Sequence, residues 1–448
     1  MTETIFALAT PPGRSGVAVI RISGPGTGAA LDALTRKPRP EARVATLRSL
    51  HAADGEVLDT GLVLWFPGPA SFTGEDMAEL HVHGGPAVIQ DVIGRLGELL
   101  GLVPAEAGQF ARRAFHNGKL DLTEIEGLAD LVDAETAAQR RQAQRQLGGA
   151  LYHRIEAWRA RLTRAQAHLE AAIDFSDEDL PAGLGETTGR EIAALVGEID
   201  ASLADGRCGE RLRRGFQLAI LGAPNAGKSS LLNALARREA AIVAETAGTT
   251  RDVVEVHLDL GGYPVTAADT AGLRGLDANA DLDPIEREGV RRAQARAEEA
   301  DLKLVVVDGT DRDAPDPTTR AMIDADTLVV VSKADVSSTG MPADIAGQPV
   351  TAVSAVTGAG LAALLDRLEN AIAARYGAGD EAPAITRERH RSALMETRDA
   401  LERARTAALP ELAAEDVRLA SRALGRITGE VDVEDLLEVI FADFCIGK

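Results

Sequence analysis

Two patterns of hydrophobic and polar positions alternate along the chain. Short apolar and β-branched runs bounded by turn residues are typical of strands, and apolar residues every three or four positions are typical of helices. Up to Asn117 the first pattern predicts strands at Val17–Ile22, Gly61–Phe66 and Met77–Val82, and a helix follows over 86–100. This part is predicted to be an α+β domain.

The helical pattern dominates from Leu120 to Arg214 and returns from Thr386 to Ile440. Acidic residues, a proline and glycines over 174–185 predict a loop in the first of these stretches. The second stretch is too short to bury a core alone, so we expect both stretches to form one all-α domain.

A βα alternation lies between the two helical stretches, from Phe216 to Tyr376, and it predicts a mostly parallel sheet. The simplest arrangement inserts this α/β domain into the helical domain, with its two ends close in space. The predicted strands are Leu218–Leu221, Val253–Leu260, Val265–Ala268, Leu302–Val307, Leu328–Val331 and Val350–Val353. The predicted domains are 1–118, 119–213, 214–377 and 378–448, a multidomain α+β, all-α and α/β chain.

The segment from Gly222 to Ser229, Gly-Ala-Pro-Asn-Ala-Gly-Lys-Ser, has the spacing of a P-loop. It follows an apolar strand and precedes a helical run, as a P-loop requires. Glycines let backbone N–H groups close around a diphosphate, Lys228 can reach the outer phosphates, and the Ser229 hydroxyl can hold Mg²⁺. The middle of the chain therefore predicts a nucleotide site.

Two further segments complete the phosphate and metal site. Asp269 ends a predicted strand and can hold the Mg²⁺ shell, while the Gly272 N–H can sense a γ-phosphate. Thr250, within Gly248–Asp252, suits a loop that ligates Mg²⁺.

A last pair of segments favours guanine over adenine. Asp335, in Ser332-Lys333-Ala334-Asp335, can accept two N–H donors from a guanine edge, and Ser354-Ala355 can add a backbone donor. Ser332 stands where asparagine is usual, and its shorter side chain predicts looser guanine binding.

The chemistry of hydrolysis is less evident from the motifs. Leu273 follows Asp269-Thr270-Ala271-Gly272 and cannot orient a water, and no arginine finger is evident. Asn225 is either an oxygen ligand for a monovalent cation beside the phosphates or a structural asparagine of the loop.

Composition narrows the classes of partner. A formal charge of −21 argues against broad binding of polyanions, and 3% aromatic residues argue against stacking platforms for single-stranded nucleic acid. Two arginine clusters, one at 140, 141 and 145 and one at 207, 211, 213 and 214, are either basic patches or solvated helix faces. Two distant cysteines and no signal or membrane-spanning pattern predict a cytoplasmic protein.

Taken together with further motifs near both ends, the chain resembles the tRNA-modifying GTPase family MnmE, also called TrmE, over essentially its whole length. The motifs that carry the resemblance outside the α/β domain are Ala9–Arg14, Ile20–Gly24, Phe72–Asp76, His83–Gly85, Arg113–Phe115, Asn117–Leu122 and Phe444–Lys448.

The resemblance implies a potassium-activated GTP hydrolase with a Ras-like α/β domain. It implies a catalytic Glu286, with Glu288 as the alternative, to orient the attacking water. The implied metal ligands are Ser229 and Thr250 for Mg²⁺, and Asn225, Ala244, Thr246 and Thr249 for K⁺. The implied GTP-binding residues are Asn225, Ala226, Gly227, Lys228, Ser229, Ser230, Ala244, Glu245, Thr246, Ala247, Gly248, Thr249, Thr250, Asp269, Thr270, Ala271, Gly272, Lys333, Asp335, Ser354 and Ala355.

The resemblance also implies that the N-terminal domain binds a tetrahydrofolate derivative (5,10-methylene or 5-formyl) and forms a homodimer. Its folate-contacting positions match Arg21, Glu79, Lys119 and Lys448. Cys445 is either a functional thiol or a buried inert one. His81 and His83, which alternate on one strand face, suggest either a metal site or a structural or substrate-pocket role.

The implied function is GTP hydrolysis coupled to modification of tRNA in a complex with MnmG, which carries FAD. The implied product has a carboxymethylaminomethyl or aminomethyl group on C5 of the wobble uridine. Two alternatives stay open, a ribosome-assembly GTPase switch and a nucleotide-binding scaffold without turnover.

Overall fold

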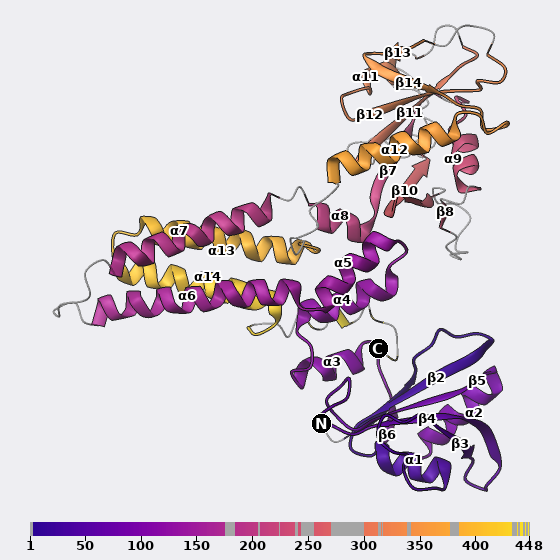
Figure 1. Cartoon of the computed structure of the whole chain (residues 1–448), viewed down its shortest axis with the longest axis vertical. Helices are drawn as coiled ribbons and strands as arrows, with labels where there is room; N and C mark the ends of the chain where they lie inside the picture. The colour runs from indigo at the N-terminus through magenta and orange to yellow at the C-terminus, as the bar shows by residue number, and fades with distance from the viewer. Residues whose placement is uncertain are drawn as a thin grey trace, which may run out of the picture. The chain divides into compact units, whose positions relative to one another are not determined.

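The computed structural model divides the chain into two compact units, residues 1–129, 146–193 and 396–448 in the first and residues 130–145 and 194–395 in the second. It describes residues 3–174, 184–204, 207–223, 225–237, 241–242, 255–269, 300–311, 315, 317–337, 342–376, 385–431, 437, 440–441, 444 and 447. Figure 1 shows the helices and strands with the labels used below.

A six-stranded sheet in the order β3-β4-β5-β2-β1-β6 forms the N-terminal domain, and only β1 and β6 pair in parallel. Three helices accompany the sheet, so the predicted α+β domain is confirmed. The strands are β1 Thr4–Leu8, β2 Ser15–Ser23, β3 Thr46–His51, β4 Val57–Phe66, β5 Met77–Gly84 and β6 Leu102–Pro104, and the helices are α1 Thr27–Thr35, α2 Pro86–Gly97 and α3 Gln109–His116.

The two faces of this sheet have different partners because side chains alternate along each strand. Ile20 and Leu80 point to the face that α1 and α2 cover, where Leu31 and Leu96 complete the core. Arg21 and Glu79 are the neighbours of Ile20 and Leu80 in their strands, and they therefore lie on the opposite face.

The helical part follows, and its 25-residue helix α6 packs against α14 within the first unit. Small residues in α14, Ala413, Ala420 and Ala423, are buried there and let the two helices approach closely. The helices are α4 Leu122–Asp133, α5 Ala137–Leu147, α6 Ala150–Asp174, α7 Leu184–Leu203, α8 Cys208–Arg214, α13 Glu388–Thr406 and α14 Pro410–Thr428. Most of the loop predicted over 174–185 lies outside the described residues.

An α/β domain is inserted between α8 and α13, as predicted, and its sheet has the strand order β13-β14-β12-β11-β7-β10-β9-β8. The five central strands are parallel to one another, and both edges end in antiparallel pairs. The elements are β7 Phe216–Leu221, α9 Lys228–Ala236, β8 Ala241–Ile242, β9 Glu255–Leu260, β10 Tyr263–Asp269, β11 Leu302–Asp308, α11 Pro317–Ala321, β12 Thr327–Ser332, β13 Asp344–Ile345, β14 Gln348–Ala352 and α12 Leu361–Tyr376.

Both faces of this second sheet are buried, which explains why its strands read as continuous apolar runs. In β11, Leu304 and Val306 face one core and Val305 and Val307 face the other. The two ends of the inserted domain also meet, because Arg391 of α13 donates from Nε to Glu210 of α8 at 2.8 Å, with both side chains buried. None of the helices among the described residues is long and apolar enough to cross a membrane.

Candidate functional site

The loop between β7 and α9 turns through positions with positive φ. Gly222 has φ 140°, and a Cβ atom there would meet the Val306 carbonyl oxygen at 2.2 Å, so only glycine fits against β11. Asn225 and Gly227 have φ 64° and 93°. Left-handed residues of this kind direct successive backbone N–H groups to one side of a loop, which creates a concavity for anions.

Lys228 begins α9 and is 6% exposed. Its Nζ donates to the carbonyl oxygens of Gly222 and Ala223, both at 2.8 Å, so the ammonium group lies over the loop. Ser229 and Ser230 follow in the first turn of α9 and are exposed. A lysine and a hydroxyl therefore lie at a helix N-terminus, where phosphate groups bind well.

Asp269 is the last residue of β10 and pairs with Ile220 in the neighbouring parallel strand β7. Because parallel strands end at the same edge of a sheet, this register places Asp269 beside the start of the loop that follows β7. The strand order reverses on the two sides of β7, and such a point is where open α/β sheets bind ligands.

The segment after β12 supplies a second set of polar groups. Lys333 has φ 54°, and its Nζ lies 2.6 Å from Oδ2 of Asp308. Burial raises the pKa of Asp308, but hydrogen bonds from Lys333 and Thr310 outweigh it and lower that pKa overall. Asp335 is exposed, as a carboxylate that accepts hydrogen bonds from a base must be.

The backbone after β14 restricts which N–H group can donate to the guanine oxygen. Ser354 is fully buried, and its N–H donates to the Ala359 carbonyl oxygen at 2.9 Å. A backbone donor for a guanine oxygen would therefore come from Ala355 rather than from Ser354.

Ser332 connects these two segments. Its Oγ donates to the Ala226 carbonyl oxygen at 2.5 Å and lies 3.2 Å from that of Val307, with the side chain 5% exposed. The shorter hydroxyl thus reaches the P-loop after all, and the looser guanine binding predicted from the sequence stays a prediction.

Several predicted residues lie outside the described part of the chain. They are Ala244, Glu245, Thr246, Ala247, Gly248, Thr249, Thr250, Thr270, Ala271, Gly272, Glu286, Glu288, Cys445 and Lys448, together with the side chain of Asp269.

A second candidate site lies on the face of the N-terminal sheet opposite α1 and α2, where Arg21 and Glu79 are 22% and 20% exposed. Arg21 of β2 pairs directly with Glu79 of β5 in the strand register, and its Nη2 lies 3.0 Å from Oε1 of Glu79. The other carboxylate oxygen of Glu79 lies 3.3 Å from Nε2 of His81. Oε1 of Glu79 accepts from both Nε and Nη2 of Arg21, at 3.2 and 3.0 Å, so Oε2 is the oxygen that keeps a lone pair for a further donor.

Aromatic rings and the end of the chain surround Arg21. Its guanidinium carbon lies 5.7 Å from the ring centroid of Phe72 and 6.0 Å from that of Phe110. Nη1 of Arg21 donates to the Gly447 carbonyl oxygen at 3.2 Å. A Cβ atom on Gly447 would meet the Leu8 carbonyl oxygen at 2.4 Å, so this C-terminal glycine lies close against β1.

Lys119 reaches the same neighbourhood from the segment after α3. It is exposed, its Nζ donates to the Pro69 carbonyl oxygen at 3.1 Å, and its stem lies beside Gly74. The loop that carries Phe72 therefore lies against Lys119.

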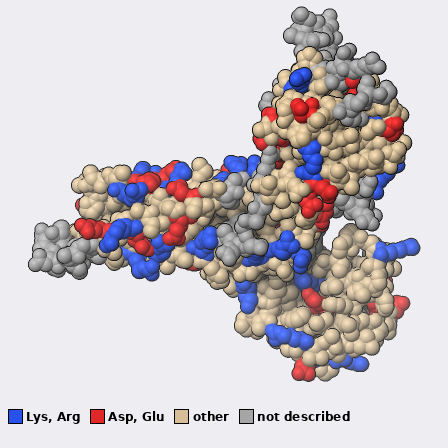
Figure 2. Space-filling view, turned by 45° about the horizontal axis from the view of Figure 1, so that its top comes forward, with Lys and Arg blue, Asp and Glu red and all other residues tan. Residues whose placement is uncertain are grey.

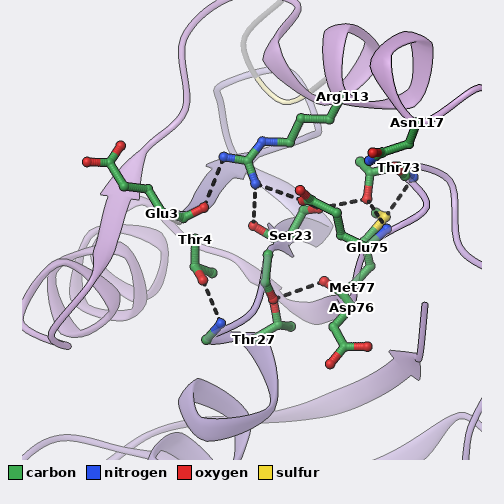
Figure 3. Close-up of polar contacts among 12 residues, drawn as sticks. Glu3, Thr4, Ser23, Thr27, Thr73, Glu75, Asp76, Met77, Arg113 and Asn117 are labelled. Atoms are coloured by element: carbon green, nitrogen blue, oxygen red, sulfur yellow. Dashed lines mark hydrogen bonds and ion pairs between the residues drawn. The ribbon is translucent and has the colours of Figure 1, made fainter. Parts of the chain in front are cut away.

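Arg113 of α3 is a buried residue to which the sequence patterns assigned no role. It is 3% exposed and donates to Oε2 of Glu75 at 2.8 Å, to the Ser23 carbonyl oxygen at 3.2 Å and to that of Glu3 at 3.1 Å. Figure 3 shows these bonds together with the Thr73 hydroxyl, which lies 2.7 Å from that of Ser23. Arg113 thus holds the loop beside Arg21 to the ends of β1 and β2.

His81 and His83 do not share a partner. His83 Nδ1 lies 2.8 Å from Oδ1 of Asp59, whereas His81 faces Glu79. Within the described ranges, no group of three His, Cys, Asp or Glu residues could hold a metal ion. The arrangement favours the substrate-pocket alternative for His81.

Comparisons with known proteins identify the family. Residues 122–445 match the family model described as the MnmE helical domain, and residues 4–119 match the model described as the GTP-binding protein TrmE N-terminus. The tRNA modification GTPase MnmE of Paramagnetospirillum magneticum is 59% identical over 448 residues and 100% of both chains. The protein of the same name from Rhodospirillum rubrum is 55% identical over 459 residues, which is 100% of this chain and 99% of that one.

Among solved structures, the G domain of the T. maritima FeoB iron transporter matches 35% of this chain and 98% of its own, with 23% identity and a TM-score of 0.27. A score this low carries no conclusion. The family model covers most of the chain and the curated relatives match it end to end, so the chain belongs to the MnmE family of tRNA modification GTPases.

Proposed function

We propose that this chain hydrolyses GTP and couples the hydrolysis to tRNA modification, as the names of its relatives state. The observation that carries the proposal is the grouping of the P-loop, the end of β10 and the segment after β12 at one edge of the sheet, with Ser332 bonded to Ala226 at 2.5 Å. Phosphoryl transfer needs little more from a protein than such positioning and charge stabilisation.

Each part of the nucleotide has a partner in this proposal. Lys228 and the N–H groups of 225–230 bind the phosphates, and Asp335 with Ala355 reads the guanine edge. Ser229 and Thr250 supply hydroxyl oxygens, the hard ligands that Mg²⁺ prefers, and Asp269 holds its shell. The metal ion, when bound, neutralises charge on the outer phosphates.

Potassium activation is the finer part of the proposal. Asn225 is exposed in a left-handed conformation at the phosphate end of the loop, and an amide oxygen suits K⁺. Ala244, Thr246 and Thr249 would complete the site with oxygen ligands, and Glu286 would orient the attacking water. The bound cation would supply the positive charge that an arginine finger supplies elsewhere.

Phosphate release in KCl and in NaCl tests this mechanism. We expect faster turnover in KCl for the wild-type chain, no such difference for Asn225→Ala, and turnover lost with GTP binding kept for Glu286→Ala. Equal and negligible rates in both salts for the wild-type chain would favour a scaffold without turnover.

The N-terminal site is proposed to bind a tetrahydrofolate derivative. Glu79 can accept a hydrogen bond from the amino-pyrimidinone edge of a pterin through Oε2, which keeps a lone pair beside His81 while Arg21 holds Oε1. Lys119 and Lys448, which directly follows Gly447 in the chain, suit the negative glutamate tail. Calorimetry with 5-formyl-tetrahydrofolate tests this site, and a ribosome-assembly switch should show no binding.

The proposed partners follow the family. A second copy of the chain would cover apolar residues on the N-terminal sheet, where Leu47 and Leu62 pair across β3 and β4 and are 65% and 41% exposed. MnmG, with its FAD, would act with this chain on the wobble uridine in the cytoplasm. The domain limits 1–118, 119–213, 214–377 and 378–448 and a functional Cys445 remain part of the proposal.

A further inference from the structure

The outward face of α5 is basic in a chain whose formal charge is −21. The helix, Ala-Ala-Gln-Arg-Arg-Gln-Ala-Gln-Arg-Gln-Leu, contains three arginines and no acidic residue. Arg140, Arg141, Gln144 and Arg145 are exposed, and they recur at the spacing of one helix face. The opposite face, with Ala138 and Ala143, is buried.

Contacts of the buried face fix which way the arginines point. The Ala138 N–H donates to the Gly262 carbonyl oxygen at 3.3 Å. Nε2 of Gln139 donates to the Arg213 carbonyl oxygen at 3.2 Å, and Nε2 of Gln142 donates to that of Gly209 at 3.1 Å. Because these bonds hold α5 to α8 and to the β9–β10 turn, the helix cannot roll to hide its basic face.

The second arginine cluster of the sequence, on and beside α8, is mostly neutralised. Arg211 lies 2.6 Å from Asp301, and Arg213 lies 3.0 Å from Asp130. Arg207 has carboxylate partners in Glu210 and Glu388 at 3.8 and 3.5 Å. These residues are solvated or paired helix positions rather than a basic patch.

Arg140, Arg141 and Arg214, by contrast, form no ion pair with any residue that the structure describes. Arg214 is exposed and lines the same small pocket as Gln139 and Gln142 of α5. Asp133 also lines this pocket, and exposed Glu135, the acid nearest to α5 along the chain, lies 3.3 Å from His257 Nδ1. Elsewhere on the face seen in Figure 2, basic and acidic side chains are interspersed over the helices.

We propose that this basic face, made of Arg140, Arg141 and Arg145, contacts the phosphate backbone of tRNA. Guanidinium groups bind phosphate oxygens in a bidentate manner, and Gln144 can donate to phosphate or ribose without adding charge. The proposal rests on the proposed action of the chain on tRNA. Because the chain as a whole is acidic, its contact with tRNA must be concentrated on a local basic surface, and the proposal places that contact on α5.

The composition of the face favours RNA over an acidic protein partner. Protein interfaces have an apolar or aromatic centre, and the exposed positions of α5 from 140 to 145 contain neither. The absence of aromatic residues also excludes base stacking by this helix. The contact is therefore electrostatic and independent of base sequence.

The test is tRNA binding by the full-length chain in its complex with MnmG over a series of KCl concentrations. For the triple variant Arg140→Gln, Arg141→Gln, Arg145→Gln, we expect the slope of log K against log salt to flatten by about 2 to 3 and affinity to fall at least about 10-fold at low salt. Hydrolysis of GTP without tRNA should not change.

The matched control removes the same three charges elsewhere. Arg398, Arg405 and Arg418 of α13 and α14 each lie beside an acidic neighbour, Asp399, Glu402 and Glu415 respectively. The triple change of these arginines to Gln should leave the salt slope as in the wild-type complex.

Two outcomes would overturn the proposal. One is an unchanged slope in the α5 variant, and the other is an equal loss in both variants, which would show a general effect of net charge. If an α5 variant binds and modifies tRNA as the wild-type chain does, the proposed tRNA contact on α5 is wrong, but the proposed function of the chain stands. If the wild-type complex modifies no tRNA, the proposed function itself is wrong.

Discussion

The two candidate sites hold their charged groups in opposite ways. In the N-terminal domain, the Glu79 carboxylate is held by charged or chargeable side chains, Arg21 and His81, at 3.0 and 3.3 Å. In the α/β domain, the Lys228 ammonium is held by neutral backbone carbonyls at 2.8 Å.

This difference predicts how each site responds to substitution. Neutral backbone dipoles orient the Lys228 ammonium over the loop, where we propose that it meets the phosphates. Arg21 pairs with Glu79, so we expect that site to select by hydrogen-bond geometry rather than by net charge. It needs a rigid support, which the buried Arg113 provides.

The largest expected effect is on stability, from removal of that support. Arg113→Met leaves Glu75 and two carbonyl oxygens without their donor, and breaking a buried ion pair costs about 3–5 kcal/mol. Urea unfolding, followed by a signal from the N-terminal domain, measures this loss of stability. Arg95→Met, which breaks the surface pair with Glu98, should cost about 1 kcal/mol or less. Equal costs in the two variants would contradict the assigned support.

The next effect is on turnover. Lys228→Ala should lower kcat/KM for GTP by about 100-fold or more, because a charge directed at the developing phosphate charge is lost. Lys303→Ala serves as the control, since Lys303 in the same domain pairs with Asp324 near the surface. Steady-state phosphate release gives the comparison, and near wild-type turnover in Lys228→Ala would contradict the role of the P-loop.

Changes in the N-terminal site should have smaller effects, confined to folate. Glu79→Gln should weaken 5-formyl-tetrahydrofolate binding by about 10-fold, the worth of a charge-assisted hydrogen bond. His81→Gln, which removes only an orienting contact, should weaken it by about 3-fold. His83→Gln is the matched control on the same strand, because His83 pairs with Asp59 instead. If calorimetry shows that His83→Gln weakens folate binding as much as Glu79→Gln does, the proposed arrangement is wrong.

A further effect concerns the pH dependence of stability. Burial raises the pKa of Asp121 to about 7, and the neighbouring Glu124 adds to the rise. Between the ordinary value of 3.8 and about 7, the folded chain keeps a proton that the unfolded chain has released. The free energy of unfolding therefore falls as pH rises through this window and levels off above it.

Asp121→Asn removes this titration and keeps an oxygen for the Thr123 and Glu124 N–H groups. Its stability relative to the wild-type chain should therefore rise between about pH 5 and pH 8. Thermal melts at both pH values measure the change, and parallel profiles for the two proteins would contradict the raised pKa.

Much of the fold could be predicted from the sequence because the longer elements have strong periodicity. The runs Val17–Ile22 and Leu302–Val307 alternate or stay apolar, and both lie in strands β2 and β11. The strand β6, Leu102–Pro104, was not predicted, because three residues give no local pattern and its pairing with β1 joins positions nearly a hundred residues apart. The eight-residue α3 was missed for a similar reason.

The candidate sites were predicted where a motif is contiguous and missed where it is not. The P-loop is one segment, so its spacing suffices. Arg113 gains its role from Glu3, Ser23 and Glu75, which only the folded sheet brings near it. The hydrogen bond from Ser332 to the Ala226 carbonyl oxygen likewise joins segments 106 residues apart, which only the folded sheet brings together.

The central claim is that the two sites serve one reaction on tRNA. The most direct test uses a host strain that lacks its own member of the family and expresses the wild-type chain, the Lys228→Ala variant or the Glu79→Gln variant. Mass spectrometry then measures the wobble uridines of its tRNA. We expect the C5-modified nucleoside with the wild-type chain and its loss or strong reduction with either variant. Full modification by both variants, or none with the wild-type chain, would contradict the account.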